Sequence, residues 1–168
     1  MTAPILTDIG YDRFTAQMSA LTRLIAASGW RPGHIVGVGR GGLVPATWLS
    51  HALDVPMLSI DLSAGIAAFA DRLLDRLAER AEAGERLLIV DDINDSGRTI
   101  AGLRAKLGRA PPALLRFAVL IDNIASSVRV DYAAETIDRA VTKDWFVFPW
   151  EQRTGEAARL DGGDRGQD

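Results

Sequence analysis

The chain has 168 residues, of which 48% are hydrophobic and 24% charged, and these values are those of one ordinary globular domain. Its net charge of -3 argues against non-specific nucleic-acid binding. The lack of cysteine excludes disulfides, thiolate metal sites and cysteine nucleophiles, and two histidines are too few for a histidine-rich metal cluster. We expect a cytoplasmic protein without a membrane segment, because neither a secretory signal nor a membrane-spanning apolar run is present.

Apolar periodicity predicts helices and strands in alternation along the chain. Apolar side chains spaced three and four residues apart share one helical face, whereas short apolar runs are typical of buried strands. In chain order, the predicted elements are a helix at 11–28, a strand at 34–38, a helix at 44–53, a strand at 56–60, a helix at 66–82, a strand at 86–90, a helix at 99–107 and a strand at 114–121. Two short strand-like pieces follow at 128–132 and 146–148, and the polar, glycine-rich residues 152–168 predict a disordered tail.

This alternation predicts an α/β domain with a mostly parallel central sheet flanked by helices. In such sheets, ligands bind beyond the carboxyl ends of the strands. Two loops that leave predicted strands have unusual compositions, namely Gly39–Gly42 and Asp91–Thr99. These loops are therefore the candidate functional segments.

The first loop allows two interpretations. The run Gly37–Gly42 matches the G-x-G-x-x-G pattern of a dinucleotide-binding turn, and Asp61 follows about 20 residues later, as that pattern requires. A dinucleotide fold usually begins with its glycine-bearing strand, however, and here a whole helix is predicted before it. A tight turn that presents backbone N–H groups to another anion also needs glycines, and Arg40 adds a positive charge suited to pyrophosphate.

The second loop, in the run LLIVDDINDSGRTI, combines two kinds of polar group. Ser96–Thr99 would place hydroxyls and N–H groups at a helix N-terminus, which favours a phosphate. The preceding Asp91 and Asp92 would repel a phosphate but suit sugar hydroxyls or a hydrated magnesium ion. Together these groups indicate a phosphorylated ribose. The alternative is a capped helix with solvated acids, because Asp, Ser and Thr are also favoured at helix starts for capping alone.

The same run resembles the phosphoribosyl-pyrophosphate (PRPP) binding motif of type I phosphoribosyltransferases, most of all the xanthine–guanine and hypoxanthine enzymes. The run GRGGLVPA (Gly39–Ala46) is similar to that family's pyrophosphate-binding loop, and DWFVFPWE (Asp144–Glu151) to its purine-binding hood. The resemblance covers roughly residues 7–151. It implies a type I phosphoribosyltransferase fold as a single domain over 1–151, including a small C-terminal hood over about 121–151.

The resemblance implies that the protein transfers 5-phosphoribosyl from PRPP to a purine base of the guanine, xanthine or hypoxanthine class. Magnesium would assist and pyrophosphate would leave, and a homodimer or homotetramer is implied. The implied site residues are Asp91 and Asp92 for the ribose and Mg²⁺; Asp95, Ser96, Gly97, Arg98 and Thr99 for the 5′-phosphate; Asp95 also as general acid or base; Arg40 and Gly41 for pyrophosphate; Trp145, Phe146 and Asn123 for the base; and Glu151 as a candidate Mg²⁺ ligand.

Two departures from the family pattern leave a second function open. Asn123 stands where the related purine enzymes have a lysine that contacts the 6-oxo group. The family's flexible lid usually contains a Ser-Tyr pair, but this chain has no tyrosine there and offers only Asp61, Ser63 and Gly65. The alternative is therefore a regulatory protein on the same fold that senses PRPP or a nucleotide without efficient catalysis.

Overall fold

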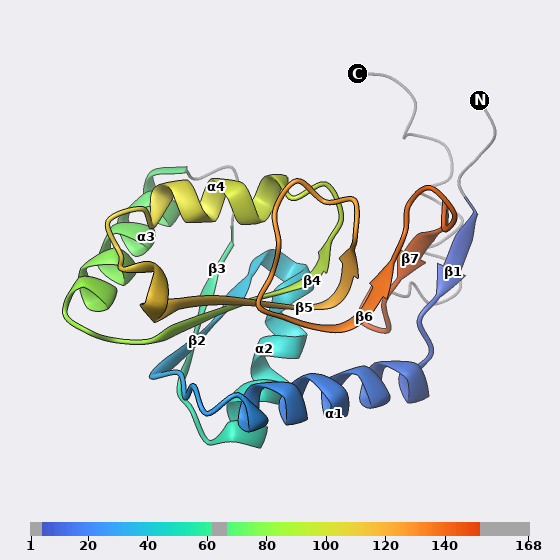
Figure 1. The fold of residues 1–168 in the computed structure, drawn as a ribbon, viewed down its shortest axis with the longest axis horizontal. Coiled ribbons are helices and arrows are strands. Elements are labelled where there is room, and N and C mark those ends of the chain that lie inside the picture. The colour runs from blue at the N-terminus through green and yellow to red at the C-terminus, as the bar shows by residue number, and fades with distance from the viewer. Residues whose placement is uncertain (1–4, 62–66, 152–168) are drawn as a thin grey trace.

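The computed structural model describes residues 5–61 and 67–151, and a parallel β-sheet lies at the centre of this part (Figure 1). Its five strands have the order β3-β2-β4-β5-β6, and each neighbouring pair is parallel. The strands are β2 (His34–Val38), β3 (Met57–Ile60), β4 (Leu87–Asn94), β5 (Leu115–Asn123) and β6 (Tyr132–Ile137). The predicted α/β architecture is confirmed.

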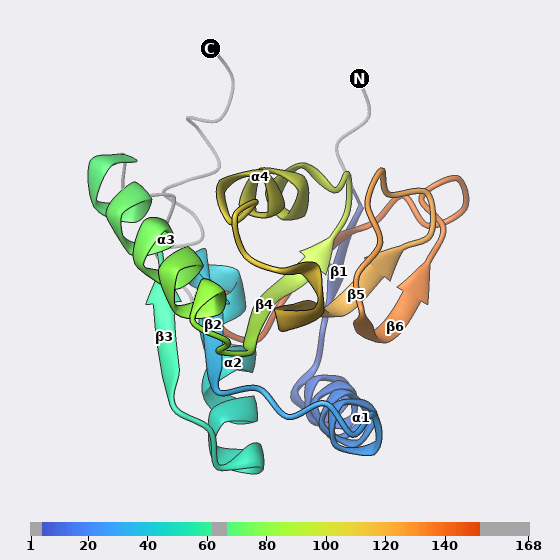
Figure 2. The ribbon, with the colours of Figure 1, turned by 60° about the vertical axis from the view of Figure 1, so that its left-hand side comes forward.

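Helices cover both faces of this sheet (Figure 2). Helices α1 (Tyr11–Ala27) and α2 (Gly39–Leu53) pack on one face, and α3 (Ala67–Glu82) and α4 (Arg98–Lys106) pack on the other. The central strands are therefore buried on both faces of the sheet: Leu87–Val90 are at most 1% exposed. This burial explains why these strands are continuous apolar runs in the sequence. Among the described residues, none of the helices is long and apolar enough to cross a membrane.

A second, two-stranded sheet joins the two ends of the described chain (Figure 1). Strand β1 (Leu6–Asp8) pairs in parallel with β7 (Trp145–Val147), and the Trp145 N–H donates to the Ile5 carbonyl oxygen at 2.7 Å. The β7 segment belongs to the expected hood. The sequence did not predict β1, because three residues are too few to show a strand pattern.

Helix α2 begins earlier than predicted. It starts at Gly39 instead of Val44, so the predicted loop Gly39–Gly42 is the first turn of the helix, and Pro45 lies inside it. Gly39 has a φ of +56°, a conformation that glycine adopts without strain and that lets α2 follow β2 directly.

Two strand predictions need correction. Strand β4 continues to Asn94 instead of ending at Val90, so the acid pair lies on the strand and not after it. The strand predicted at 128–132 is wrong, because the next strand begins only at Tyr132. Residues 128–131 are irregular, and their apolar side chains pack against the cluster beneath α3 and α4. The tail at 152–168 and the lid candidates Ser63 and Gly65 lie outside the described residues.

Candidate active site

The carboxyl ends of the neighbouring strands β2 and β4 bring the two predicted loops together. Helix α2 starts where β2 ends, and its first turn lies against β4. A Cβ atom added to Gly41 would overlap the carboxylate of Asp92, and one added to Gly42 would overlap the carbonyl oxygen of Val90. Only glycine permits this approach, and the exposed Arg40 precedes Gly41 in this first turn.

Asp91 and Asp92 form a crowded, partly buried pair of carboxylates near the end of β4. The Asp92 N–H donates to Asp91 Oδ1 at 3.0 Å, and the Ile93 N–H donates to Asp92 Oδ1 at 2.7 Å. Burial, followed by the charge of Asp92, raises the pKa of Asp91 to about 8. Burial, with a contribution from the charge of Glu151, raises the pKa of Asp92 to about 6. A positive charge beside this pair would stabilise it.

This donor set fits a magnesium ion that is shared with a ligand. Magnesium usually keeps several waters and binds one or two protein carboxylates together with substrate phosphates. Within the described residues, no cluster of three or more His, Cys, Asp or Glu side chains could hold a metal. Glu151 lines the same cavity as Asp92, but its Oε2 accepts the Phe148 N–H at 2.9 Å.

The predicted phosphate segment is the N-terminus of α4. Gly97 is the N-cap with a φ of +86°, and a Cβ atom there would lie 2.5 Å from Ser127 Oγ and 2.8 Å from Ser126 Oγ. Both the backbone angle and the close neighbours therefore require glycine. Ser96 Oγ accepts the Arg98 backbone N–H at 3.4 Å, and the side chains of Ser96, Arg98 and Thr99 are exposed. The N–H groups at the start of a helix suit an anion.

A cavity of about 100 Å³ separates the acid pair from the hood. Its lining consists of acidic and aromatic side chains together with one arginine: Asp92, Ile93, Asp95, Arg139, Trp145, Phe146, Phe148 and Glu151. Phe146 and Phe148 are 7% and 2% exposed, whereas Trp145 is 63% exposed. The indole of Trp145 is therefore available to a ligand, while the two phenylalanine rings belong to the core.

Asn123 lies beside this cavity and not in its wall. It is 5% exposed, and its Nδ2 donates to the Asp95 carbonyl oxygen at 3.0 Å. Its Oδ1 accepts the backbone N–H groups of Ala125 at 3.1 Å and Arg139 at 3.3 Å. The side chain thus connects three backbone segments.

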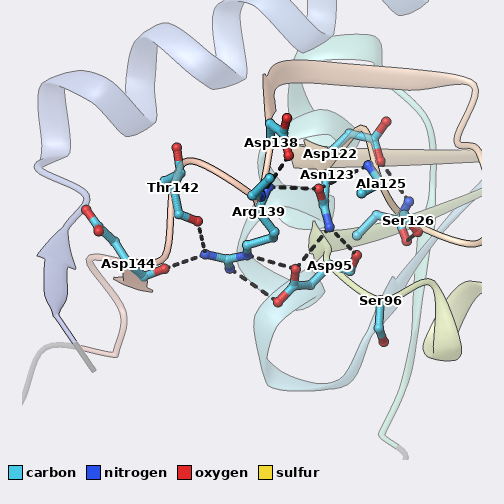
Figure 3. A network of polar contacts seen from close by, with 12 residues as sticks. Asp95, Ser96, Asp122, Asn123, Ala125, Ser126, Asp138, Arg139, Thr142 and Asp144 are labelled. Carbon is cyan, nitrogen blue, oxygen red and sulfur yellow. Dashed lines mark hydrogen bonds and ion pairs between the residues drawn. The ribbon is translucent and has the colours of Figure 1, made fainter. Parts of the chain in front are cut away.

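Arg139 is the site residue that the sequence did not reveal (Figure 3). Its guanidinium forms a bidentate ion pair with Asp95, with Nε to Oδ1 at 2.8 Å and Nη2 to Oδ2 at 3.2 Å. Its Nη1 donates to the carbonyl oxygens of Thr142 and Asp144. Arg139 belongs to no recognisable motif. The only signal in the sequence is an arginine shortly before the aromatic run Asp144–Glu151 of the hood.

A family model of the phosphoribosyl transferase domain matches residues 11–154. The chain belongs to this family. The phosphoribosyltransferase class and fold expected from the acid-pair segment are thereby confirmed. The same match favours the anion-binding interpretation of Gly37–Gly42 over the dinucleotide interpretation.

Three solved structures are similar to this phosphoribosyltransferase along nearly its whole length. A purine phosphoribosyltransferase from Pyrococcus horikoshii Ot3 has 25% identity and a TM-score of 0.66, covering 89% of this chain and 97% of that one. The xanthine-guanine-hypoxanthine phosphoribosyltransferase of Helicobacter pylori has 18% identity and a TM-score of 0.66, covering 95% and 99%. A hypothetical protein from Neisseria gonorrhoeae with bound ppGpp has 19% identity and a TM-score of 0.71, covering 95% and 97%. At 18% and 19% identity, the likeness to the last two structures shows a shared fold and nothing about function.

Proposed function

We propose that this phosphoribosyltransferase transfers the 5-phosphoribosyl group of PRPP to a purine base of the guanine, xanthine or hypoxanthine class. The observation that carries the proposal is the packing of the first turn of α2 against Asp92. It brings the helix start that carries Arg40 against the acid pair, and the segment Asp95–Thr99 at the start of α4 follows that pair closely in the chain. These are the groups that a pyrophosphate, a ribose and a 5′-phosphate respectively require.

Each part of PRPP has a counterpart among these residues. Asp91 and Asp92 accept hydrogen bonds from the ribose hydroxyls, and the N-terminus of α4, from Asp95 to Thr99, binds the 5′-phosphate. Arg40 and the Gly41 backbone bind the pyrophosphate. Magnesium, when bound by Asp91 and Asp92 together with the substrate, would neutralise charge on the leaving group. Glu151 is a further candidate ligand for that ion.

The reaction breaks the bond between C1 of the ribose and the pyrophosphate oxygen, and forms a bond from C1 to a purine ring nitrogen. The protein contributes by positioning both reactants and by stabilising the charge that develops. Asp95 lies at the cavity and is 48% exposed, so it can reach a purine nitrogen. It would act there as general base or general acid.

The base would occupy the cavity beneath the hood. Trp145 would stack on the purine, and the Phe146 backbone would hydrogen-bond its edge. The large exposed fraction of Trp145 supports this role, because a core tryptophan would be covered. The purine class is supported by the likeness to the Pyrococcus horikoshii enzyme, whose substrate class is purine.

The substitution Asp95→Asn tests the catalytic role. Loss of a general acid or base typically costs about 10²–10⁴-fold in rate, so we expect kcat to fall by at least about 10²-fold. The Kd of PRPP, measured by titration calorimetry, should change far less than kcat does.

Asp138→Asn is the matched control, because the Asp138 carboxylate accepts the Ala140 N–H near the site but does not line the cavity. Its kcat should equal that of the wild type. An Asp95→Asn protein with unchanged kcat would show that Asp95 has no catalytic role.

A further inference from the structure

We propose that Arg139 selects the acceptor base by donating a hydrogen bond to the 6-oxo edge of the purine, so that adenine is rejected. This inference rests on the proposed function. It assigns base recognition to the segment between β6 and β7, and it gives Asn123 a positioning role instead of a base contact.

Arg139 is placed where a base would lie. Its side chain is 22% exposed and lines the same cavity as Asp95 and Trp145. Its Cζ atom lies 5.4 Å from the centroid of the Phe146 ring. A planar ligand that stacks on Trp145 and enters this cavity would meet the guanidinium of Arg139 there.

The guanidinium is fixed before any ligand arrives (Figure 3). Asp95 binds its Nε and Nη2, while the Thr142 and Asp144 carbonyls bind its Nη1. Within the described residues, these contacts engage all its N–H groups except one on Nη2. One N–H group on Nη2 is thus left for a ligand, and the contacts of the other N–H groups already hold the guanidinium in its orientation.

Asn123 explains how this arrangement is maintained. Its amide joins the Asp95 carbonyl to the Arg139 backbone N–H, and so fixes the distance between the two members of the ion pair. An uncharged residue suffices here, because Arg139 supplies the positive charge from a different segment. Asn123 is therefore a positioning residue for the pair.

The chemistry of arginine sets the preference. A guanidinium carries only donors, so its partner on the base must be an acceptor. Guanine, hypoxanthine and xanthine each present a 6-oxo acceptor, whereas adenine presents a 6-amino donor that would oppose the free N–H. A partly buried donor without a partner is costly, and sites built on such hydrogen bonds discriminate strongly.

The test compares Arg139→Gln with Lys143→Gln, a matched control that removes one exposed positive charge from the same segment. The kcat/KM for guanine, hypoxanthine and adenine would be measured, together with the Kd of GMP and AMP by calorimetry. In the wild type and in Lys143→Gln, we expect kcat/KM to be at least tenfold higher for guanine and hypoxanthine than for adenine. We also expect GMP to bind at least tenfold more tightly than AMP. In Arg139→Gln this preference should fall to about one, while the Kd of PRPP stays unchanged.

The two proposals fail in different ways. Absence of turnover with every base would contradict the proposed function, yet the GMP-to-AMP preference would still test Arg139. An equal preference in the wild type and in Arg139→Gln would overturn the present inference. If Arg139→Gln does not fold, Arg139→Lys replaces it in the test, because lysine keeps the positive charge but lacks the planar set of N–H donors of the guanidinium. We then expect a reduced preference, and an unchanged one would again refute the role of Arg139.

Discussion

Asp91 and Asp92 show how a single strand end can favour a cationic ligand. Two carboxylates follow one another on β4, and burial keeps water from solvating their charges. Their pKa values of about 8 and about 6 lie above the usual value of 3.8. The folded protein therefore binds protons more tightly at these groups than the unfolded chain does.

Stability should depend on pH as a result. A carboxyl group whose pKa is raised by folding stabilises the native state at low pH, and this stabilisation is lost as pH rises towards the folded pKa. The free energy of unfolding should therefore fall between about pH 4 and pH 8 as Asp91 loses its proton.

The substitution Asp91→Asn should flatten this decline, which can be followed by measuring Tm at a series of pH values. The exposed Asp75→Asn, on α3, should leave the decline as in the wild type. An equal decline in Asp91→Asn would refute this origin of the pH dependence.

Close contact between elements, more than side-chain chemistry, brings the first turn of α2 against the acid pair. Helix α2 lies so close to β4 that a Cβ atom at Gly42 would overlap the Val90 carbonyl oxygen. The backbone of β4 cannot yield without shifting Asp91, which follows Val90 directly. The two helix starts and the acid pair therefore depend on glycine for their spacing.

Gly42→Ala should both destabilise the protein and weaken PRPP binding. Forcing an extra methyl group into a packed site typically costs about 1–3 kcal/mol, so we expect a loss of that order in the free energy of unfolding. Denaturant titration and calorimetry with PRPP would measure the two effects. Gly102→Ala is the control, because no atom lies within 4 Å of a Cβ there, and alanine in a helix interior should add about 0.5–1 kcal/mol. Wild-type stability and PRPP affinity in Gly42→Ala would contradict the account.

The order of elements in the whole molecule could be predicted because the central strands are apolar throughout and the helices are periodic. The residues of β2 were predicted without error, since glycine and proline bound that short buried run. The acid-pair segment was recognisable for a different reason, namely that its chemistry is local in sequence. The start of α2 was missed because glycines usually indicate a turn, whereas here they permit close packing.

Other parts depend on contacts that no local pattern records. Strand β6 (Tyr132–Ile137) contains two alanines and a glutamate, so its apolar pattern is weak. The nearby Val128 and Val130 gave a stronger strand pattern, although they lie in a loop. Strand β1 exists because it pairs with β7, far along the chain. Arg139 reaches Asp95 across 44 positions in sequence, and only the fold brings the two together.

The most direct test of the central claim is a turnover assay with detection by mass spectrometry. The protein would be incubated with PRPP, Mg²⁺ and a mixture of guanine, xanthine, hypoxanthine, adenine and pyrimidine bases. We expect the nucleoside monophosphate of a 6-oxopurine, together with an equal amount of pyrophosphate. No new nucleotide from the folded protein, while a known phosphoribosyltransferase is active in parallel, would contradict the account and favour a regulatory protein that binds PRPP or a nucleotide without turnover.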